Sequence, residues 1–327
     1  MEGYRYSAIL SVVGSCCDRF LSSGYSDPFS IEEMFNRVSA VKGITGVELV
    51  GDWHITTQNV SFIKEQLVRT GLKLVSIIPD HFGKREWAKG AFSSKDKKIR
   101  EKAVEHTKEL IDAAVALGCD LISLWPGQDG YDYGFQGNYI DEREWIEEGI
   151  RECCRYRKDV KISIEYKLKE PRTHSYIANV AQTLLMIKEI NEENCGVTID
   201  FGHALVAYEN PAESVALCKK YGNKLFHIHM NDNYRYWDDD MIVGSVHTLE
   251  YIEFLYWLRR TGYDGWISID QYPYREDGKE ALRESIEWLF ALEEIVNKIK
   301  EDEIEELYKS GNACEVNRYL RQLLLSH

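Results

Sequence analysis

Four side chains of types that commonly bind metals stand at the ends of short apolar runs in the second half of the sequence: Glu165, Asp200, His229 and Asp270. Each such run is typical of a buried strand. Three carboxylates packed together would repel one another and raise their own pKa values unless a cation lay between them. Three carboxylate oxygens with one imidazole suit Mn²⁺, Co²⁺ or Mg²⁺ better than an ion that prefers thiolates. The pattern predicts a divalent metal site, provided that the fold brings the four runs together.

A second group of ligand-type residues lies close to the first in the sequence. His203 follows Asp200 by three residues, and three consecutive aspartates at positions 238–240 follow the run that holds His229. Taken alone, the acidic triplet is typical of a solvated turn. Beside an existing site and with a histidine nearby, it indicates a second metal, with Glu165 free to bridge the two ions.

Several aromatic side chains are candidates to line a site. Trp125 closes the fourth apolar run and is a candidate to stack on an apolar face of a ligand, although a tryptophan there also fills space. His54 and His81 fall at or after the second and third runs, where they are candidates to face the mouth. His227 shares a face with His229 one layer deeper, which fits a core histidine hydrogen-bonded to the site as well as a substrate contact. We expect the remaining histidines to be surface residues: His106, His174, His247 and His327.

Eight apolar runs, separated by amphipathic segments, must position these residues. The runs cover residues 7–13, 46–50, 72–78, 120–125, 161–166, 196–200, 225–230 and 266–270. Segments with helical periodicity lie between them, among them 30–41, 94–117, 176–190, 212–221, 248–261 and 280–299. Eight strand-then-helix units predict an α/β fold of the closed (β/α)₈ TIM barrel type. We expect residues 1–299 to form the barrel domain, and residues 300–327 to form a short C-terminal helical tail that packs on the barrel or on a neighbouring subunit.

Alternation within the late runs supports the barrel. In residues 161–165, Ile162 and Ile164 share one face, while Ser163 and Glu165 share the other. The runs that end near residues 200, 229 and 270 alternate in the same way. Four late strands therefore point a carboxylate or imidazole inward near their C-terminal ends, which is where barrel active sites lie. The long Gly-rich and aromatic segment 125–134 predicts a functional loop over the mouth.

Composition and charge exclude other classes of protein. The 327 residues carry 40 Lys and Arg against 54 Asp and Glu, which gives a formal net charge of −14. An acidic chain without a basic stripe is not expected to bind nucleic acid. The eight cysteines form no CxxC motif, and no apolar stretch approaches the roughly 20 residues of a membrane span. With no signal peptide, the pattern favours a cytoplasmic enzyme with reduced thiols and no membrane partner.

The residues around the candidate ligands resemble the xylose-isomerase-like barrel superfamily, and within it the two-metal aldose–ketose isomerases of the L-rhamnose isomerase and xylose isomerase type. The segment EYKLKEPR at 165–172 resembles their E-x-K-x-x-E-P motif, and DFGH at 200–203 resembles their acid-x-x-His motif. The segment HMND at 229–232, followed by DDDMIVGS at 238–245, is similar to the strand-seven region of L-rhamnose isomerases. The resemblance spans the eight strands up to about residue 299, and the motifs are specific in combination.

This resemblance implies two sets of metal ligands. A structural metal would be held by Glu165, Asp200, His229 and Asp270, and a catalytic metal by Glu165, His203, Asp238 and Asp240. Two divalent ions are implied, with Mn²⁺ expected first and Co²⁺ or Mg²⁺ as alternatives. Lys167 would contact the carbonyl oxygen of the sugar, and Trp125 would form an aromatic wall of the pocket.

The implied activity is a sugar isomerase that interconverts an unphosphorylated aldose and ketose by a metal-assisted hydride shift from C2 to C1. Lys167, Glu165 and Asp238 would act in catalysis, and the expected substrate contacts are Trp125, His81, Lys167 and His227, with His81 a candidate to assist ring opening. The alternative is a ketose 3-epimerase or a sugar-derivative lyase that uses a single metal in the same barrel. Apurinic endonucleases share this barrel, but the acidic charge argues against them. The expected partners are a small sugar and further copies of this chain, in a dimer or tetramer.

Overall fold

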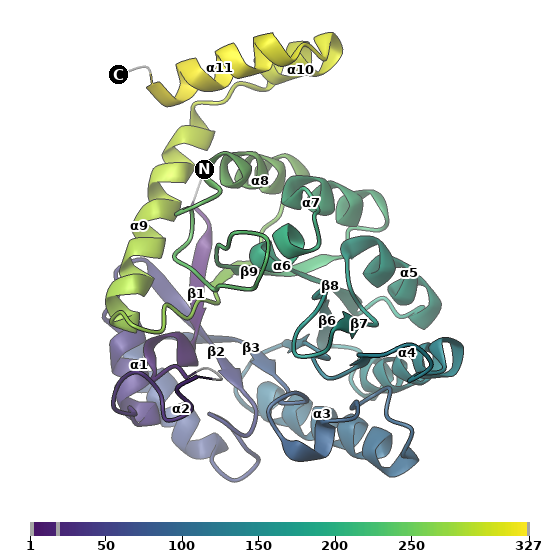
Figure 1. Cartoon of the computed structure of the whole chain (residues 1–327). Helices are drawn as coiled ribbons and strands as arrows, with labels where there is room; N and C mark the ends of the chain where they lie inside the picture. Colours follow the sequence, from purple (N-terminus) through teal and green to yellow (C-terminus); the bar gives the residue numbers. More distant parts are fainter. Residues whose placement is uncertain (1–2, 18–19, 326–327) are drawn as a thin grey trace.

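Eight parallel strands close into a barrel in the computed structural model, which describes residues 3–17 and 20–325 (Figure 1). The barrel strands are β1 (Arg5–Ile9), β2 (Ile44–Val50), β3 (Lys73–Ile78), β4 (Leu121–Leu124), β6 (Lys161–Glu165), β8 (Cys195–Asp200), β9 (Leu225–Met230) and β10 (Trp266–Ile269). Strand β1 pairs in parallel with both β2 and β10, and this double pairing closes the barrel. The predicted (β/α)₈ barrel is confirmed.

Helices surround the strands on the outside of the barrel (Figure 1). They are α1 (Ile31–Ser39), α2 (Val60–Thr70), α3 (Lys97–Ala116), α4 (Tyr139–Tyr156), α5 (Val180–Ile190), α6 (Phe201–Val206), α7 (Pro211–Lys220), α8 (Thr248–Thr261) and α9 (Gly278–Asn297). Several begin at a residue whose side chain accepts a hydrogen bond from a first-turn amide, as Ser30, Asp96 and Asp277 do. Among the described residues, no helix combines the length and the apolar character that a bilayer crossing requires.

The first strand is shorter than the run 7–13 predicts. Strand β1 ends at Ile9, and a 3₁₀ helix, η1 (Leu10–Val13), follows it. Leu10, Val12 and Val13 are buried in both the predicted and the observed conformation, so an apolar run does not reveal where the strand ends. The 3₁₀ turn brings Ser11 to the mouth of the barrel, where it lines a cavity.

Small hydroxyl side chains fill the interior of the barrel below the mouth. Thr198 Oγ1 donates to Ser163 Oγ at 2.7 Å and lies 3.2 Å from Ser123 Oγ, while Ser7 and Ser268 are hydrogen-bonded to each other across β1 and β10. All five side chains are fully buried. The alternation along the strands therefore separates a polar barrel interior from an apolar layer packed against the helices, as the sequence predicts.

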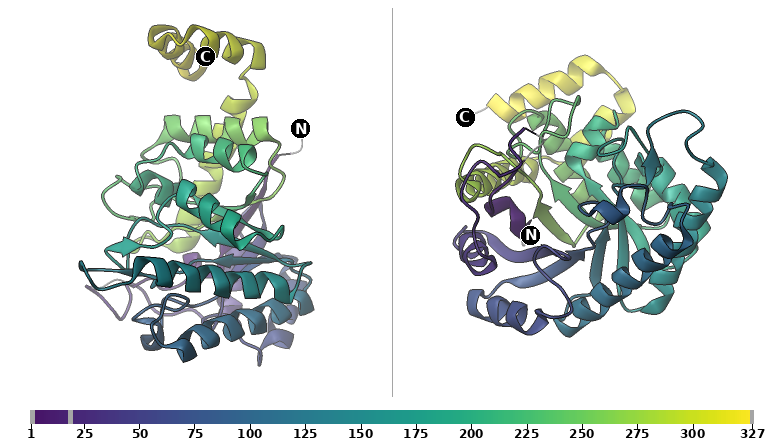
Figure 2. Two further views of the ribbon diagram at one scale, coloured as in Figure 1. Left: turned by 90° about the vertical axis from the view of Figure 1, so that its right-hand side faces the viewer. Right: turned by 60° about the horizontal axis from the view of Figure 1, so that its bottom comes forward.

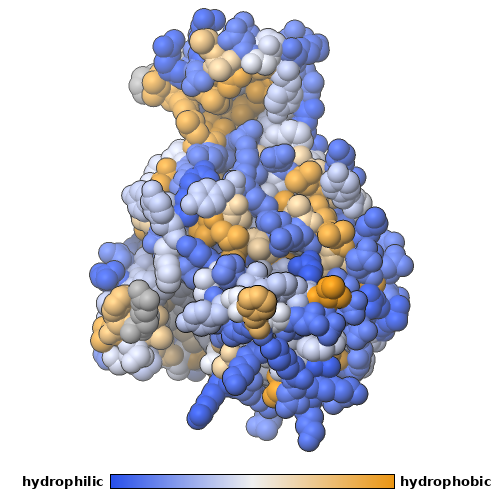
Figure 3. Space-filling model, turned by 45° about the vertical axis from the view of Figure 1, so that its right-hand side comes forward, coloured by the Kyte–Doolittle hydropathy of each residue, from blue (hydrophilic) through white to orange (hydrophobic). Residues whose placement is uncertain are grey.

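Two features lie outside the regular barrel. In the loop after β4, β5 (Gly130–Tyr131) pairs antiparallel with β7 (His174–Ser175) of the loop after β6. At the C-terminus, α10 (Glu301–Ser310) and α11 (Ala313–Leu325) form an extension that stands off from the ring of helices (Figure 2). Neither helix has a fully buried residue, and apolar surface gathers on the side of the extension that faces the barrel (Figure 3).

Candidate metal centre

The four candidate ligands of the first site meet at the C-terminal mouth of the barrel. Glu165 and Asp200 are the last residues of β6 and β8, His229 lies in β9, and Asp270 directly follows β10. One ligand atom from each of the four lies within 4.8 Å of the others. Because these strands are parallel neighbours, their C-terminal ends must open on one side of the barrel, and this brings together residues up to 105 positions apart in the sequence, 165 to 270.

Burial and mutual repulsion make this cluster costly without a cation. Burial raises the pKa of Asp200 to about 6 and that of Asp270 to about 8, and in both cases the charge of Glu165 adds to the effect while His229 opposes it. The buried Nδ1 of His229 has no hydrogen-bond partner, although it faces Glu165 Oε2 at 3.2 Å and Asp270 Oδ2 at 3.6 Å. An unpartnered nitrogen surrounded by carboxylate oxygens fits a divalent cation with mixed oxygen and nitrogen ligands.

His203 and Asp238 lie beside the first cluster. Asp200 Oδ1 accepts a hydrogen bond from His203 N at 2.8 Å and so caps α6, which places the His203 ring over the mouth. The Nδ1 of His203 lies 3.0 Å from the carbonyl oxygen of Tyr166, which only accepts, so Nδ1 carries the proton. Nε2 faces Asp238 Oδ2 at 3.0 Å, and Asp238 Oδ1 is buried without a partner. Burial lowers the pKa of His203, but the charges of Asp200 and Asp238 outweigh it and raise that pKa well above its ordinary value, so a cation bound here would take the place of the Nε2 proton. This pair fits a second cation.

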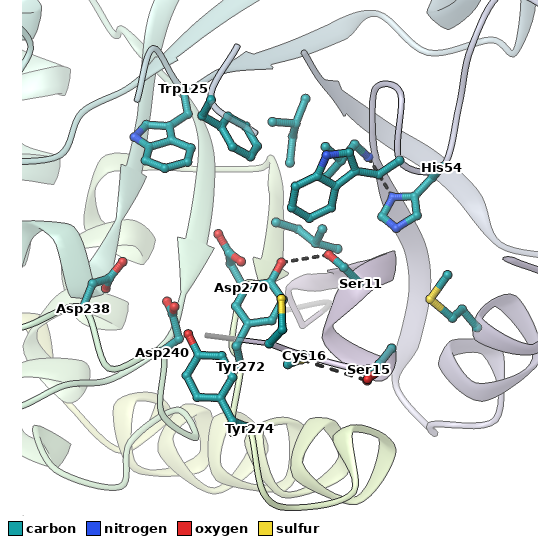
Figure 4. A pocket seen from close by; sticks show the side chains of 18 of the residues that line it. Ser11, Ser15, Cys16, His54, Trp125, Asp238, Asp240, Asp270, Tyr272 and Tyr274 are labelled. Carbon is teal, nitrogen blue, oxygen red and sulfur yellow. Dashed lines mark hydrogen bonds between the residues drawn. The ribbon is translucent and has the colours of Figure 1, made fainter. Parts of the chain in front are cut away.

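Lys167 and Asp240 complete the polar side of the site. Lys167 Nζ lies 2.7 Å from Asp238 Oδ2 and 3.6 Å from Glu170 Oε2. Burial raises the pKa of Asp240, and the charges of Asp238 and Asp270 raise it further. Figure 4 shows the carboxylates of Asp238, Asp240 and Asp270 around one cavity. The structure thus gathers all seven predicted ligands at the mouth, and their role as ligands stays a prediction.

The cavity above these ligands has a volume of about 460 Å³, and several aromatic side chains line it. Trp125 lines it as predicted, with its ring 4.5 Å from that of Phe82, and Lys167 Nζ lies 5.1 Å from the Trp125 ring centre. Side chains that the sequence did not single out also line the cavity: Ser11, Cys16, Phe29, Tyr272 and Tyr274. In the sequence, only their positions after the first and last barrel strands could have indicated that these residues lie at the mouth.

His54 also lines this cavity, and its protonation is well defined. Its Nδ1 accepts a hydrogen bond from Val50 N at 2.9 Å, so the ring proton lies on Nε2. Burial lowers the pKa of His54 to about 4, which keeps the ring neutral near pH 7. His54 is therefore a neutral hydrogen-bond donor at the cavity.

Two predicted substrate contacts lie elsewhere. His81 does not line the cavity: its fully buried ring packs edge-on against Trp87 and Phe92, each 5.2 Å away, and its Nε2 faces His106 Nδ1 at 3.2 Å. His227 lies inside the barrel one layer below the mouth, with its Nε2 2.8 Å from Glu48 Oε1. The structure therefore places both rings away from the cavity lining, and His227 matches the alternative of a core histidine.

The expectation of surface positions is wrong for two of the remaining histidines. The side chain of His106 is 13% exposed, because it packs between His81 and Asp52. The side chain of His247 is 12% exposed, with Nδ1 at 2.8 Å from the fully buried carboxylate of Asp232. His174 is exposed as expected, and His327 lies outside the described residues.

Comparison with known proteins agrees with this architecture. A family model described as xylose isomerase-like TIM barrel matches residues 35–292. The xylose isomerase of Thermus thermophilus is 29% identical over 240 residues, which cover 72% of this chain and 60% of that protein. An uncharacterized protein of Methanocaldococcus jannaschii is 28% identical over 243 residues, covering 72% of this chain and 78% of that protein. The match thus spans about 60% of the length of the Thermus enzyme.

Solved structures share the fold at lower identity. A D-tagatose 3-epimerase-like protein superposes with a TM-score of 0.70 at 24% identity, over 90% of this chain and 98% of that one. A D-psicose 3-epimerase superposes with a TM-score of 0.69 at 14% identity, over 88% and 99% of the two chains. With the family match extending over most of the barrel, the chain belongs to the xylose isomerase-like TIM barrel family.

Proposed function

We propose that this chain is a divalent-metal-dependent sugar isomerase that interconverts an unphosphorylated aldose and ketose. The observation that carries the proposal is the pair of adjacent ligand groups at the barrel mouth, in each of which a buried imidazole nitrogen faces a carboxylate oxygen, at 3.2 Å in the first group and 3.0 Å in the second. Two ions fit this arrangement, and the oxygen-rich ligand set favours Mn²⁺, with Co²⁺ or Mg²⁺ as alternatives.

Two sets of residues would hold the ions, and Lys167 would act on the sugar. Glu165, Asp200, His229 and Asp270 would hold one ion, and Glu165, His203, Asp238 and Asp240 the other. When bound, the ions would supply Lewis-acid polarisation of the sugar carbonyl. Lys167, fixed by Asp238 and Glu170, would direct a positive charge at the oxygen on which negative charge develops. Hydrogen would move from C2 to C1 as hydride, while the proton of the C2 hydroxyl passes to the oxygen on C1.

The cavity suits a small neutral sugar better than a sugar phosphate. Its volume of about 460 Å³ falls in the usual range for small-molecule sites. Among the described residues that line it, Lys167 is the one with a permanent positive charge, and that charge is already paired with Asp238 and Glu170. No further lysine or arginine of this lining remains for a phosphate, whereas Trp125 and Phe82 offer faces on which the C–H side of a sugar can stack.

A ketose 3-epimerase, or a sugar-derivative lyase, with a single metal is the second candidate. The ammonium of Lys167 at 2.7 Å from Asp238 favours it, because the lysine already compensates part of the charge that a second ion would neutralise. This candidate needs the first ligand group and leaves Asp238 and Asp240 without a metal.

One labelling experiment separates the two reactions. The Mn²⁺-loaded protein is incubated in deuterated water with a panel of aldoses and ketoses, and the products are analysed by NMR. The isomerase is expected to form the partner ketose or aldose with little solvent deuterium at C1 or C2. Epimerisation would instead place solvent deuterium at C3, and elimination would yield an unsaturated or dehydrated product. Either of these outcomes, or the absence of any product across the panel, would overturn the isomerase.

The number of ions per chain provides a second test. Elemental analysis after loading is expected to give two Mn²⁺ per chain, and Asp238→Ala is expected to reduce this to one and abolish isomerisation. Asp239→Asn is the matched control, because Asp239 accepts a hydrogen bond from Tyr234 N and does not line the cavity. One ion per chain in the unmodified protein, or full turnover by Asp238→Ala, would count against the two-metal site.

A further inference from the structure

Glu48 is a fully buried carboxylate on β2 that reaches across the barrel interior to β9. Its Oε1 lies 2.8 Å from His227 Nε2, and its Oε2 lies 3.4 Å from His229 Nε2. The hydroxyl of Ser76 on β3 also donates to Oε2. Three donors from two other strands therefore converge on one side chain that lies outside both candidate ligand sets.

These contacts determine where the proton of His229 lies. A carboxylate only accepts hydrogen bonds, so the Nε2 atoms that face Glu48 carry the ring protons. The Nδ1 of His229 is buried without a hydrogen-bond partner and faces Glu165 and Asp270 at 3.2 and 3.6 Å, so it is the nitrogen that would bind a cation there and give up any proton to it. Glu48 therefore contacts the Nε2 side of the ring, and the Nδ1 side points at the first ligand group.

We propose that Glu48 is a positioning residue for the first metal, which acts by fixing the tautomer and the orientation of His229. Glu48, His229 and the ion would form a carboxylate–histidine–metal chain, in which the outer carboxylate also makes the imidazole a stronger ligand. The proposal rests on the metal site of the proposed function and not on the reaction. Nothing in the run 46–50 reveals the role, because Glu48 and His229 are 181 positions apart in the sequence.

A different reading would make Glu48 itself a ligand, together with His227 and His229. Their ligand atoms also lie within 4.8 Å of one another. That reading requires both histidines to give up their Nε2 protons, and it takes His229 away from Glu165 and Asp270. The positioning role keeps both Nε2 protons on Glu48 and leaves His229 facing Glu165 and Asp270, so the geometry favours it.

Mn²⁺ affinity of Glu48 variants, measured by competition with a chelator, tests the proposal. Glu48→Gln keeps the size of the side chain but replaces one acceptor oxygen with a donor, so one of the converging N–H groups loses its partner. Glu48→Ala removes both acceptors. We expect the affinity for the first Mn²⁺ to fall about 10- to 100-fold in both variants. Glu142→Gln is the matched control, because Glu142 is a buried glutamate that accepts hydrogen bonds from Tyr176 and from Asn138 N outside the cavity lining. The Mn²⁺ affinity of this control variant should stay within twofold of that of the unmodified protein.

A second readout follows the tautomer itself. In the Mg²⁺-loaded protein with ¹⁵N-labelled histidine, the proton of His229 is expected on Nε2, and Glu48→Gln is expected to shift or broaden that signal. If Glu48→Gln bound Mn²⁺ with unchanged affinity and showed an unchanged His229 signal, the positioning role would be overturned. The same holds if Glu48→Gln lost the second ion and kept the first. A loss of affinity in a protein that converts no sugar would leave this proposal standing and remove the proposed reaction, so the two can fail separately. The Mn²⁺ affinity of Glu48→Ala is compared only if its circular dichroism spectrum matches that of the unmodified protein. If the spectra differ, the result for Glu48→Gln alone tests the proposal.

Discussion

Lys167 is a buried cation held between two carboxylates at the edge of the cavity. Burial alone would lower the pKa of Lys167, but the charges of Asp238, Asp240 and Glu170 outweigh burial and raise it above its ordinary value. The side chain therefore stays charged at neutral pH, and its ion pairs with Asp238 and Glu170 restrict where that charge lies. A fixed charge of this kind stabilises a developing oxyanion without reorganisation.

Replacing Lys167 with methionine is expected to lower kcat about 10²- to 10³-fold and to have a smaller effect on KM, because the charge acts mainly on the transition state. Steady-state kinetics with the best sugar of the panel provides the measurement. Lys169→Met on the same loop is the control, since Lys169 is half-buried, lies outside the cavity lining and donates to Tyr236 O. A Lys167→Met enzyme with kcat within threefold of the original would contradict this role.

Individual residues were predictable where a local pattern controls their direction. Period-two alternation places Glu165 and Asp200 inside the barrel from the strand sequence alone, because each side chain direction follows from its neighbours. Glu48 and Tyr272 could not be found in this way. Their roles depend on which strands meet across the barrel and how the last loop folds back, and neither is encoded within a few residues of the position itself.

At the scale of elements, the first turn of α6 depends on a close contact with the end of β9. A Cβ atom at Gly202 would overlap Asn231 Oδ1 and would lie 2.8 Å from Asn233 Nδ2. Asn231 Nδ2 donates to Asp200 Oδ2 at 2.8 Å, and Asn233 Nδ2 donates to Gly202 O at 3.0 Å. The glycine between Asp200 and His203 therefore allows β9 to support a candidate ligand.

Gly202→Ala is expected to displace Asn231, weaken Mn²⁺ binding at least several-fold and reduce the free energy of unfolding by about 1–3 kcal/mol. Chelator competition and urea denaturation measure the two effects. Gly134→Ala is the control, because Gly134 is exposed and a Cβ there would meet nothing within 4 Å. Unaltered metal affinity in Gly202→Ala would show that this contact does not support the site.

Strand β1 and helix α9 meet at a glutamate, Glu293, whose titration is expected to make stability depend on pH away from the candidate metal centre. Burial raises the pKa of Glu293 from 4.5 to about 7, although a backbone hydrogen bond from Tyr4 opposes this, and the hydroxyl of Tyr6 donates to the carboxyl group. Because the fold favours the protonated form, the contribution of Glu293 to stability is complete below about pH 4.5 and is lost as the pH rises through about 7.

Glu293→Gln keeps an acceptor for Tyr6 but cannot ionise, so the variant should match the original protein near pH 5 and exceed it at pH 8.5. We expect a gain of about 1 kcal/mol in the free energy of unfolding, a value reduced from the full shift because Glu293 is partly exposed. Urea denaturation at the two pH values measures it, with Glu294→Gln on the exposed side of α9 as the control. If the variant and the original protein differed in free energy of unfolding by the same amount at both pH values, Glu293 would not titrate in this way.

At the scale of the whole molecule, the sequence predicted the barrel because the strand-then-helix period repeats eight times and each repeat is local. It did not predict the 3₁₀ turn after β1, where the buried pattern is the same for strand and helix. The extension formed by α10 and α11 was expected as an amphipathic tail, and it stands off the barrel with half-buried apolar residues such as Leu320 and Leu323. Leu323 and Leu324 contact the hydrophobic core, as expected for packing on the barrel, and the alternative of packing on a neighbouring subunit stays a prediction.

Part of the net charge of −14 comes from acidic residues that lie together in the fold. Glu165, Asp200, Asp238, Asp240 and Asp270 all gather at one end of the barrel, where their carboxyl groups oppose one another's ionisation. Divalent ions bound there act on the native state alone, because the unfolded chain separates the ligands by up to 105 residues, 165 to 270. Metal binding is therefore expected to be a large contribution to the stability of the barrel.

Removal of metal with EDTA is expected to lower Tm by several degrees, and Mn²⁺ should restore it in proportion to the logarithm of its concentration. An ion at 100 times its Kd stabilises a native protein by about 2.7 kcal/mol. Differential scanning calorimetry measures the shift.

In Asp270→Asn the Mn²⁺-dependent rise in Tm should largely disappear, since that change removes a charged ligand without removing the side chain. NaCl at equal ionic strength distinguishes binding from screening, because screening acts on all the acidic residues and does not depend on Asp270. If NaCl raised Tm as much as Mn²⁺ does, the cluster would be an acidic surface relieved by salt and not a metal centre.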